Sequence, residues 1–294
     1  MALRGPPAER SPAELLSFGV LNLDKPPGPS AHQVAAWVRD LAGVDRAAHA
    51  GTLDPKVTGC LPMLLGDATR MAQVFDDSEK EYVAVLEVHD RVNQPDLERV
   101  AADFEDEIYQ KPPKKSAVVR RLRVREIIDL AVLESEQRQA LLRVRCESGT
   151  YIRKLCHDIG MALGTGAHMG DLRRVGTGPF DDRDLATLHD FADALAWYRE
   201  DDDPVALEAV VQPAERALVD LPSVTIAESA AKAVADGAPV YAPGVIDADA
   251  CLGPDAEPLV ACYTPNGAVV CLGHLIGDPD AESGTVVDLE RVLV

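Results

Sequence analysis

Residues 49–59 read HAGTLDPKVTG, and the carboxylate of Asp54 is the unusual member of this stretch. Pro55 has no backbone N–H and pushes the residue before it toward extended geometry, so Asp54 is expected in a loop with a fixed backbone. An isolated Leu-Asp-Pro stretch is most often an ordinary turn. Only partners from distant parts of the chain would make this a catalytic loop.

The patterns around the loop predict strands and helices in mixed order. GVLNLDK at 19–25 predicts a strand, and Ser30 predicts the N-cap of a helix whose apolar stripe contains Val34, Trp37, Val38 and Leu41. Pro62 predicts that CLPMLLG at 60–66 is an edge or irregular strand, because proline cannot donate to a ladder. Asp67 is expected to cap a short helix over 68–75. Further strands are expected over 81–89 and 140–147, and further helices over 95–106, 149–164 and 181–204.

These elements show no regular βαβ period, so the expected fold class is α+β with a mixed, largely antiparallel sheet and flanking helices. From about residue 214 the chain becomes rich in small residues, glycine and proline, with short strands such as PLVACYT and AVVCLGHLI. This change predicts a second, small β-rich domain. The expected division is an N-terminal extension over 1–18, a large domain over 19–213 and the β-rich domain over 214–294.

Charge is unevenly distributed along the chain. The net charge is −20, of which residues 1–180 carry −2 and residues 181–294 carry −18. The basic residues comprise 21 Arg and only 8 Lys, a balance that together with surplus aspartate suits a surface that stays hydrated in concentrated salt. An acidic interaction domain is the alternative, and composition does not separate the two.

Composition also limits the class of protein. The six cysteines are scattered without Cys-x-x-Cys pairs, which favours buried thiols over a zinc site or a disulfide framework. No stretch reaches the ~18 apolar residues of a membrane span, and the N-terminal sequence is too broken by proline and charge for a signal peptide. A cytoplasmic protein without bound metal is expected.

No phosphate-binding glycine loop, dinucleotide fingerprint or zincin motif is present. The remaining candidates for chemistry are polar residues in unusual places: Asp54, Tyr82 in EKEYVAV, and Arg153 in SGTYIRKLCHDIG. By themselves a strand tyrosine is usually packing and an arginine near a helix start is usually a solvated surface residue. Local structure cannot join the three.

Six segments together are distinctive: LNLDKPPGPSAHQVAAWVR, HAGTLDPKVTGCLP, KEYVAVL, KPPKKSAVVRRLRVREI, CESGTYIRKLCHDIG and GAHMGDLRRVGTGPF. In sequence and order they resemble the TruB and dyskerin family of pseudouridine synthases, and most of all its archaeal dyskerin-like branch. The stretch LPSVTIAESAAKAVADGAPVYAPGV resembles the start of a PUA domain, a small RNA-binding β-barrel. The chain ends at VDLERVLV, before the tryptophan-containing tail of archaeal dyskerin-like proteins, so the resemblance does not extend to contacts of that tail.

The resemblance implies an enzyme that isomerises uridine in RNA with one aspartate and no cofactor. Asp54 matches the catalytic aspartate, Arg153 the arginine that pairs with it, and Tyr82 the tyrosine that stacks on the target base and takes or relays a proton. The uridine must leave the helix to reach such a pocket. A glycosidase is disfavoured because no second carboxylate recurs in a comparable loop.

Substrate-binding residues follow from the same resemblance. His49 matches a histidine near the flipped nucleotide, with a loop-ordering hydrogen bond as the alternative. Leu172 and the Arg173–Arg174 pair match a motif that lines the pocket, with a core leucine beside surface arginines as the alternative. Lys25 lies in a motif interpreted as mainly structural. Between 111 and 125 there are seven basic and no acidic residues, which favours phosphate contacts by Lys114, Lys115, Arg120 and Arg121 over a merely solvated charge run.

The implied partners are transfer RNA, ribosomal RNA, a box H/ACA guide RNA, two small H/ACA core proteins and a kink-turn-binding ribosomal-type protein. Two other functions stay open at this point. One is a stand-alone synthase that acts on a T-loop uridine of transfer RNA without a guide. The other is a non-catalytic RNA scaffold that has kept the fold, against which the full set of Asp54, Tyr82 and Arg153 counts.

Overall fold

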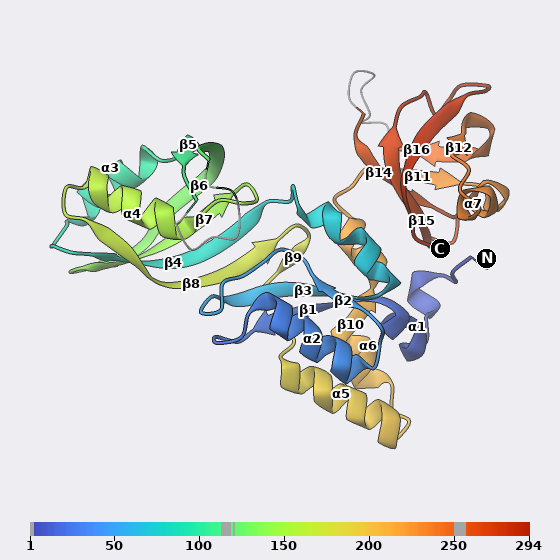
Figure 1. The fold of residues 1–294 in the computed structure, drawn as a ribbon, viewed down its shortest axis with the longest axis horizontal. Coiled ribbons are helices and arrows are strands. Elements are labelled where there is room, and N and C mark those ends of the chain that lie inside the picture. Colours follow the sequence, from blue (N-terminus) through green and yellow to red (C-terminus); the bar gives the residue numbers. More distant parts are fainter. Residues whose placement is uncertain (1–2, 113–118, 120, 250–256) are drawn as a thin grey trace.

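A computed structural model describes residues 3–112, 119, 121–249 and 257–294 of the chain. Within them the strands form two sheets that lie apart in Figure 1. The main path of the larger, ten-stranded sheet runs β10 (Val211–Pro213), β1 (Phe18–Lys25), β3 (Thr58–Gly66), β8 (Ala167–Thr177), β4 (Lys80–Val88), β7 (Gln139–Cys146), β6 (Arg123–Glu136) and β5 (Asp106–Gln110). Two short strands are added to it: β2 (Ala47–His49) pairs with β3, and β9 (Phe180–Asp181) pairs with β8.

The second sheet has six strands. Its order is β12 (Val240–Tyr241), β16 (Thr285–Val292), β15 (Val269–Leu275), β14 (Leu259–Tyr263), β11 (Ser223–Ile226) and β13 (Val245–Ala248). Between the described strands only the β3–β8 and β11–β14 pairs are parallel. The expected α+β fold with a largely antiparallel sheet is confirmed.

Helices pack beside both sheets (Figure 1). The α-helices are α1 (Pro12–Ser17), α2 (Ala31–Ala42), α3 (Gln94–Ala102), α4 (Ile152–Ala162), α5 (Leu188–Glu200), α6 (Val205–Val210) and α7 (Glu228–Ala235). The 3-10 helices are η1 (Pro7–Glu9), η2 (Asp67–Phe75), η3 (Ala214–Leu218) and η4 (Ala242–Gly244). As expected, α2 begins after Ser30, whose hydroxyl accepts a hydrogen bond from the Gln33 N–H at 3.2 Å.

Three local expectations were wrong. β3 is an interior strand, fully paired with β1 on one side. Pro62 is tolerated there because it lies between the β3 residues that pair with β8 and those that pair with β2, where the second ladder is interrupted. Trp37 is 41% exposed, since α2 buries the small residue Ala35 on its inner face instead. Asp67 makes no capping bond and pairs with Arg46.

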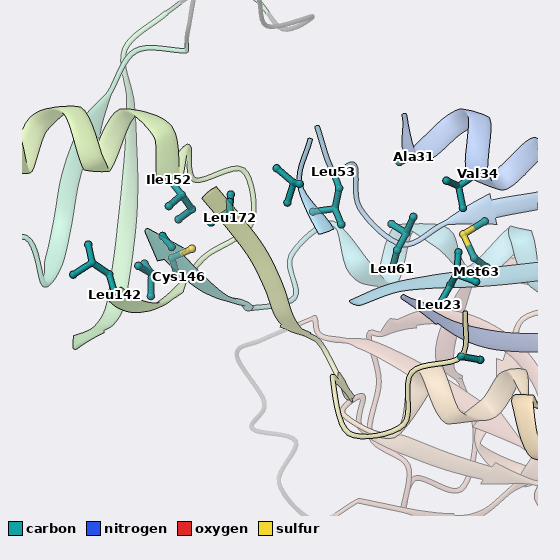
Figure 2. Close-up of a cluster of buried hydrophobic side chains, with 14 of the residues drawn as sticks. Leu23, Ala31, Val34, Leu53, Leu61, Met63, Leu142, Cys146, Ile152 and Leu172 are labelled. Carbon is teal, nitrogen blue, oxygen red and sulfur yellow. The ribbon is translucent and has the colours of Figure 1, made fainter. Parts of the chain in front are cut away.

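One core cluster of buried side chains includes Leu53 and Ile152, which directly precede Asp54 and Arg153 (Figure 2). Leu142, Cys146, Ile152 and Leu172 gather at one end of the view, and Leu23, Leu61 and Met63 gather at the other. Leu53, the residue before Asp54, lies between them and is 3% exposed. The loop is therefore anchored in the core by its leucine while the next residue points away.

The N-terminal segment fastens the two sheets to one another. Arg10 and Glu215 form a buried bidentate pair with N···O distances of 2.7 and 2.6 Å, and Glu215 also accepts from the backbone N–H of Val269 in β15. The N and C termini lie side by side in Figure 1, where Arg4 donates to the Leu293 carbonyl at 3.0 Å. A second core cluster contains Phe18 of β1 together with residues of β14 and β15, so the two sheets share apolar contacts.

Candidate active site

Asp54 lies in the loop between β2 and β3, and its side chain is about half exposed. The fully buried Lys25 holds the loop from below: its ammonium donates to the carbonyls of Pro26, Pro55 and Val57 at 2.8–3.0 Å. Burial lowers the pKa of Lys25, and the Asp54 carboxylate opposes that shift. The structural interpretation of Lys25 has a direct cause in these bonds, because two of them fix the backbone of the loop just after Asp54, at Pro55 and Val57.

Arg153 reaches Asp54 from the first turn of α4. Its Nη2 donates to Oδ2 of Asp54 across 99 positions of sequence. The side chains are 51% and 56% exposed, respectively. An ion pair that faces solvent contributes little to folding, so its formation between distant elements points to a role at the surface.

Tyr82 is on β4, partly buried against the core cluster. Burial raises the pKa of its phenol, the positive charge and a hydrogen bond of Arg174 oppose the rise, and the Asp54 carboxylate adds to it. Tyr82 is the cross-strand partner of Arg174 in β8, and Arg174 donates to the carbonyls of Ala50 and Gly51 at the start of the Asp54 loop. The structure thus pairs Arg153 with Asp54 and connects the Tyr82 strand position to the Asp54 loop through Arg174.

His49 ends β2, five residues before Asp54. Its Nδ1 is buried and has no hydrogen-bond partner among the described residues, and its ring makes an edge contact with His32 at a centroid distance of 4.7 Å. Burial is the main cause that lowers the pKa of His49 to about 4, and the nearby His32 and Arg174 side chains lower it further. The imidazole is therefore neutral at pH 7.

The expected pocket-lining residues of β8 have different surroundings. Leu172 is 8% exposed and belongs to the core cluster (Figure 2). Arg173 is engaged in a bidentate pair with Asp24 at 2.9 and 3.1 Å, and the hydrogen bond to Asp24 raises the pKa of Arg173. About a third of each of these two paired side chains remains exposed.

The basic segment is described only in part. Lys114, Lys115 and Arg120 lie outside the described residues. Arg121 is exposed and follows Val119, to whose carbonyl it donates its backbone N–H at 3.0 Å. Further along, Arg125 pairs with Glu147 at 2.9 Å, so this arginine is ion-paired.

Two buried cations lie behind the site: Arg174, which the family resemblance placed with Arg173 in a pocket-lining motif without showing that it is buried, and Lys80, which sequence reasoning did not single out. Arg174 is 1% exposed and is the largest fully buried side chain among the described residues. Lys80 is also buried, donating to the Phe75 carbonyl at 2.8 Å, and burial lowers its pKa to about 8. An arginine pair after a leucine gives no signal for which member turns inward, because that depends on strand register.

The described part of the chain also bears on the expectations for metal ligands, cysteines and membrane spans. It contains no group of three or more His, Cys, Asp or Glu side chains placed to hold a metal ion. Its five cysteines are free and buried, and Cys251 lies outside the described residues. None of the described helices is long and apolar enough to cross a membrane.

The sequence matches models of known protein families along most of its length. Residues 39–152 match the TruB family pseudouridylate synthase N-terminal domain, residues 153–219 the tRNA pseudouridylate synthase B C-terminal domain, residues 5–35 the DKCLD domain and residues 222–292 the PUA domain. A protein of Halobacterium salinarum named probable tRNA pseudouridine synthase B is 66% identical over 306 residues, covering all of both chains. A protein of the same name from Pyrococcus abyssi is 43% identical, covering 99% of this chain and 88% of its own.

Solved structures agree in fold over almost the whole chain. A Cbf5-Nop10-Gar1 complex contains a chain that is 43% identical, with a TM-score of 0.93, covering 99% of this chain and 90% of that one. An H/ACA RNP bound to a substrate RNA containing 2′-deoxyuridine gives 41% identity and a TM-score of 0.92, with the same coverage. With relatives of this identity along its full length, the chain belongs to the TruB/Cbf5-type family of RNA pseudouridine synthases that carry a PUA domain.

Proposed function

We propose that Asp54 is the catalytic residue of this RNA pseudouridine synthase. The observation that supports this most is the exposed Asp54–Arg153 pair, formed by residues 99 positions apart. The reaction breaks the bond between N1 of uracil and C1′ of the ribose, then forms a bond between C5 and C1′. An ionised carboxylate near C1′ can act as a nucleophile or stabilise an oxocarbenium-like species in the first step.

The neighbouring residues have complementary roles in this proposal. The Arg153 guanidinium orients the carboxylate and keeps it ionised, because an opposite charge within contact distance favours the charged form. Tyr82 presents an aromatic face on which the detached uracil stacks. After the C5–C1′ bond forms, C5 must lose its proton and N1 must carry one in the product, and the Tyr82 oxygen takes or relays the proton from C5.

Access to C1′ requires the uridine to be turned out of the RNA helix. We propose that two residues contact the displaced nucleotide: His49, which is neutral and lies next to the loop, and Arg173 of β8, which is partly exposed. The basic residues Lys114, Lys115, Arg120 and Arg121 are proposed to contact phosphates, since Lys and Arg supply most backbone contacts to RNA.

The structural similarity to chains in a Cbf5-Nop10-Gar1 complex and an H/ACA RNP supports a guide-directed enzyme. In this proposal a guide RNA, two small H/ACA core proteins and a kink-turn-binding protein complete the particle. Direct action on a T-loop uridine of transfer RNA is the second candidate, supported by the names of the relatives.

Asp54→Asn tests the catalytic assignment. The amide keeps the shape but supplies neither a nucleophile nor an anion, so we expect RNA binding near that of the wild type and loss of pseudouridine formation by about 10³-fold or more. Purified protein would be incubated with unmodified transfer RNA, with and without guide RNA and core proteins, and pseudouridine mapped by position. Turnover by the asparagine variant would refute the assignment, and product without a guide would favour direct action on transfer RNA.

A further inference from the structure

Arg174 is buried directly behind the loop that carries Asp54. Its Nε donates to the Cys60 carbonyl at 2.8 Å, and its Nη2 donates to the carbonyls of Ala50 and Gly51 at 3.2 Å each. A planar guanidinium is suited to such a set, because its donors point in fixed directions in one plane. Through these bonds a single side chain joins strand β3 to the first residues of the Asp54 loop.

The position of Arg174 coincides with an interruption of the sheet. On one side, β3 pairs with β8 at Thr58 and Gly59 and with β2 from Met63 onward. The intervening carbonyls have no strand partner on that side and would be buried without hydrogen bonds, at a cost of about 1–3 kcal/mol each. The Arg174 guanidinium donates to the Cys60 carbonyl, and the backbone N–H of Ala50 donates to the Pro62 carbonyl at 2.8 Å.

The Arg174 guanidinium lies so close to Gly51 that a side chain at that position would crowd it. Gly51 has φ +85°, in the left-handed region, and an added Cβ would lie 3.2 Å from Nη1 of Arg174. Arg174 is also the cross-strand partner of Tyr82 in the β4–β8 ladder. The same buried residue therefore contacts the start of the Asp54 loop and neighbours the strand position that carries the aromatic ring.

We propose that Arg174 is a positioning residue of the reaction: its guanidinium, held between β3 and the Ala50–Gly51 carbonyls, sets the location of Asp54 relative to Tyr82. It does not touch the substrate. The inference rests on the proposed role of Asp54 and adds to it a fixed support on the N-terminal side of the loop, where Lys25 supports only the C-terminal side. A displacement of about 1 Å at a reacting group can cost on the order of 100-fold in rate.

Arg174→Lys tests this, with Arg10→Lys as the matched control. Both arginines are buried, and each donates at least two hydrogen bonds. Lysine keeps the positive charge at these positions but lacks the planar guanidinium that donates in several fixed directions. Arg10 lies at the seam of the two sheets and contacts no part of the Asp54 loop in the bonds it makes. We expect kcat of Arg174→Lys to fall about 100-fold with KM changed less than about threefold, and kcat of Arg10→Lys to stay within about twofold.

Hydrogen–deuterium exchange of the complete protein supplies a readout independent of activity. Uptake over 50–57 should rise in Arg174→Lys and stay unchanged in Arg10→Lys, at a temperature where both remain folded. Wild-type kcat in folded Arg174→Lys, or an equal loss in Arg10→Lys, would overturn the proposal, as would lost activity with unchanged exchange over 50–57.

If Arg174→Lys does not fold, Gly51→Ala disturbs the same contact from the loop side and should give the same kcat loss and exchange increase; normal values would overturn the proposal. Asp54→Asn is measured in parallel, because activity in that variant would refute the role of Asp54 whatever Arg174 does.

Discussion

Asp54 and Arg153 are about half exposed, whereas the cations that hold the loop on either side of Asp54, Lys25 and Arg174, are buried. The site therefore keeps its reacting carboxylate accessible and places the supporting charges inside. Each buried cation is satisfied by backbone carbonyls, which a low-dielectric interior requires. Accessibility and rigidity of Asp54 have separate sources in this arrangement.

Arg153→Ala should separate activity from stability. An exposed ion pair contributes at most about 1 kcal/mol, so the melting temperature should change little, while the rate of pseudouridine formation should fall by about 10²-fold because the carboxylate loses its orienting partner. Melting temperature and kcat would be measured on the same preparation. Arg39→Ala, which removes an exposed pair with Asp40 in the last turn of α2, is the control expected to change neither. An unchanged rate in Arg153→Ala would make Arg153 an ordinary surface residue.

His49 gives a prediction for pH. Its folded-state pKa is about 4, below the ~6.5 of an unfolded histidine, so between these values the unfolded chain binds more protons than the folded one. Stability should therefore fall as pH drops from about 6.5 toward 4. In His49→Gln the urea midpoint should lose less over that window than in the wild type. Identical pH slopes for the two proteins would contradict the lowered pKa.

Helix α4 sets the position of Arg153. Gly160 allows this helix to pack very close to strand β8. A Cβ on Gly160 would lie 2.1 Å from the backbone nitrogen of Ala167 at the start of β8. The helix thus packs closer to the strand than any other residue would permit. Where a helix packs directly against a strand backbone, an inserted side chain must displace the helix, because the interior is already close-packed.

Gly160→Ala should consequently lower both stability and activity. Overpacking costs about 1–3 kcal/mol, more than the gain of up to about 1 kcal/mol in helix propensity, and the shift of α4 carries Arg153 away from Asp54. The free energy of unfolding in urea and kcat would be compared with Gly5→Ala, where nothing lies within 4 Å of an added Cβ. A more stable, fully active Gly160→Ala would show that α4 adjusts freely.

Over the complete chain, charge is divided between a nearly balanced N-terminal part and a strongly acidic part over 181–294. The second sheet is joined to the first by the buried Arg10–Glu215 pair and by shared apolar contacts. Repulsion among surface carboxylates acts over ~10 Å in dilute buffer and over ~3 Å at molar salt.

Salt should therefore raise stability and activity together. We expect the melting temperature and the rate to increase between dilute buffer and molar potassium chloride, because screening removes repulsion within 181–294 while short-range phosphate contacts persist. Phosphate-dominated RNA affinity alone would fall steeply over the same range, so the RNA Kd is measured alongside. A melting temperature that is flat or falling would reject salt adaptation and favour an acidic partner-binding domain.

The sequence by itself determined the strand at 19–25, the capped helix after Ser30 and the loop that holds Asp54, because capping, periodicity and proline geometry are local properties. Its motif order also supported the family. The family resemblance implied that Arg153 pairs with Asp54, and only the tertiary structure showed the contact. Only the tertiary structure decided that β3 is interior despite Pro62, and that Arg174 rather than Arg173 turns inward. Those outcomes depend on strand register and on contacts between residues far apart in the chain, and no local pattern encodes which distant backbone will come to need a donor.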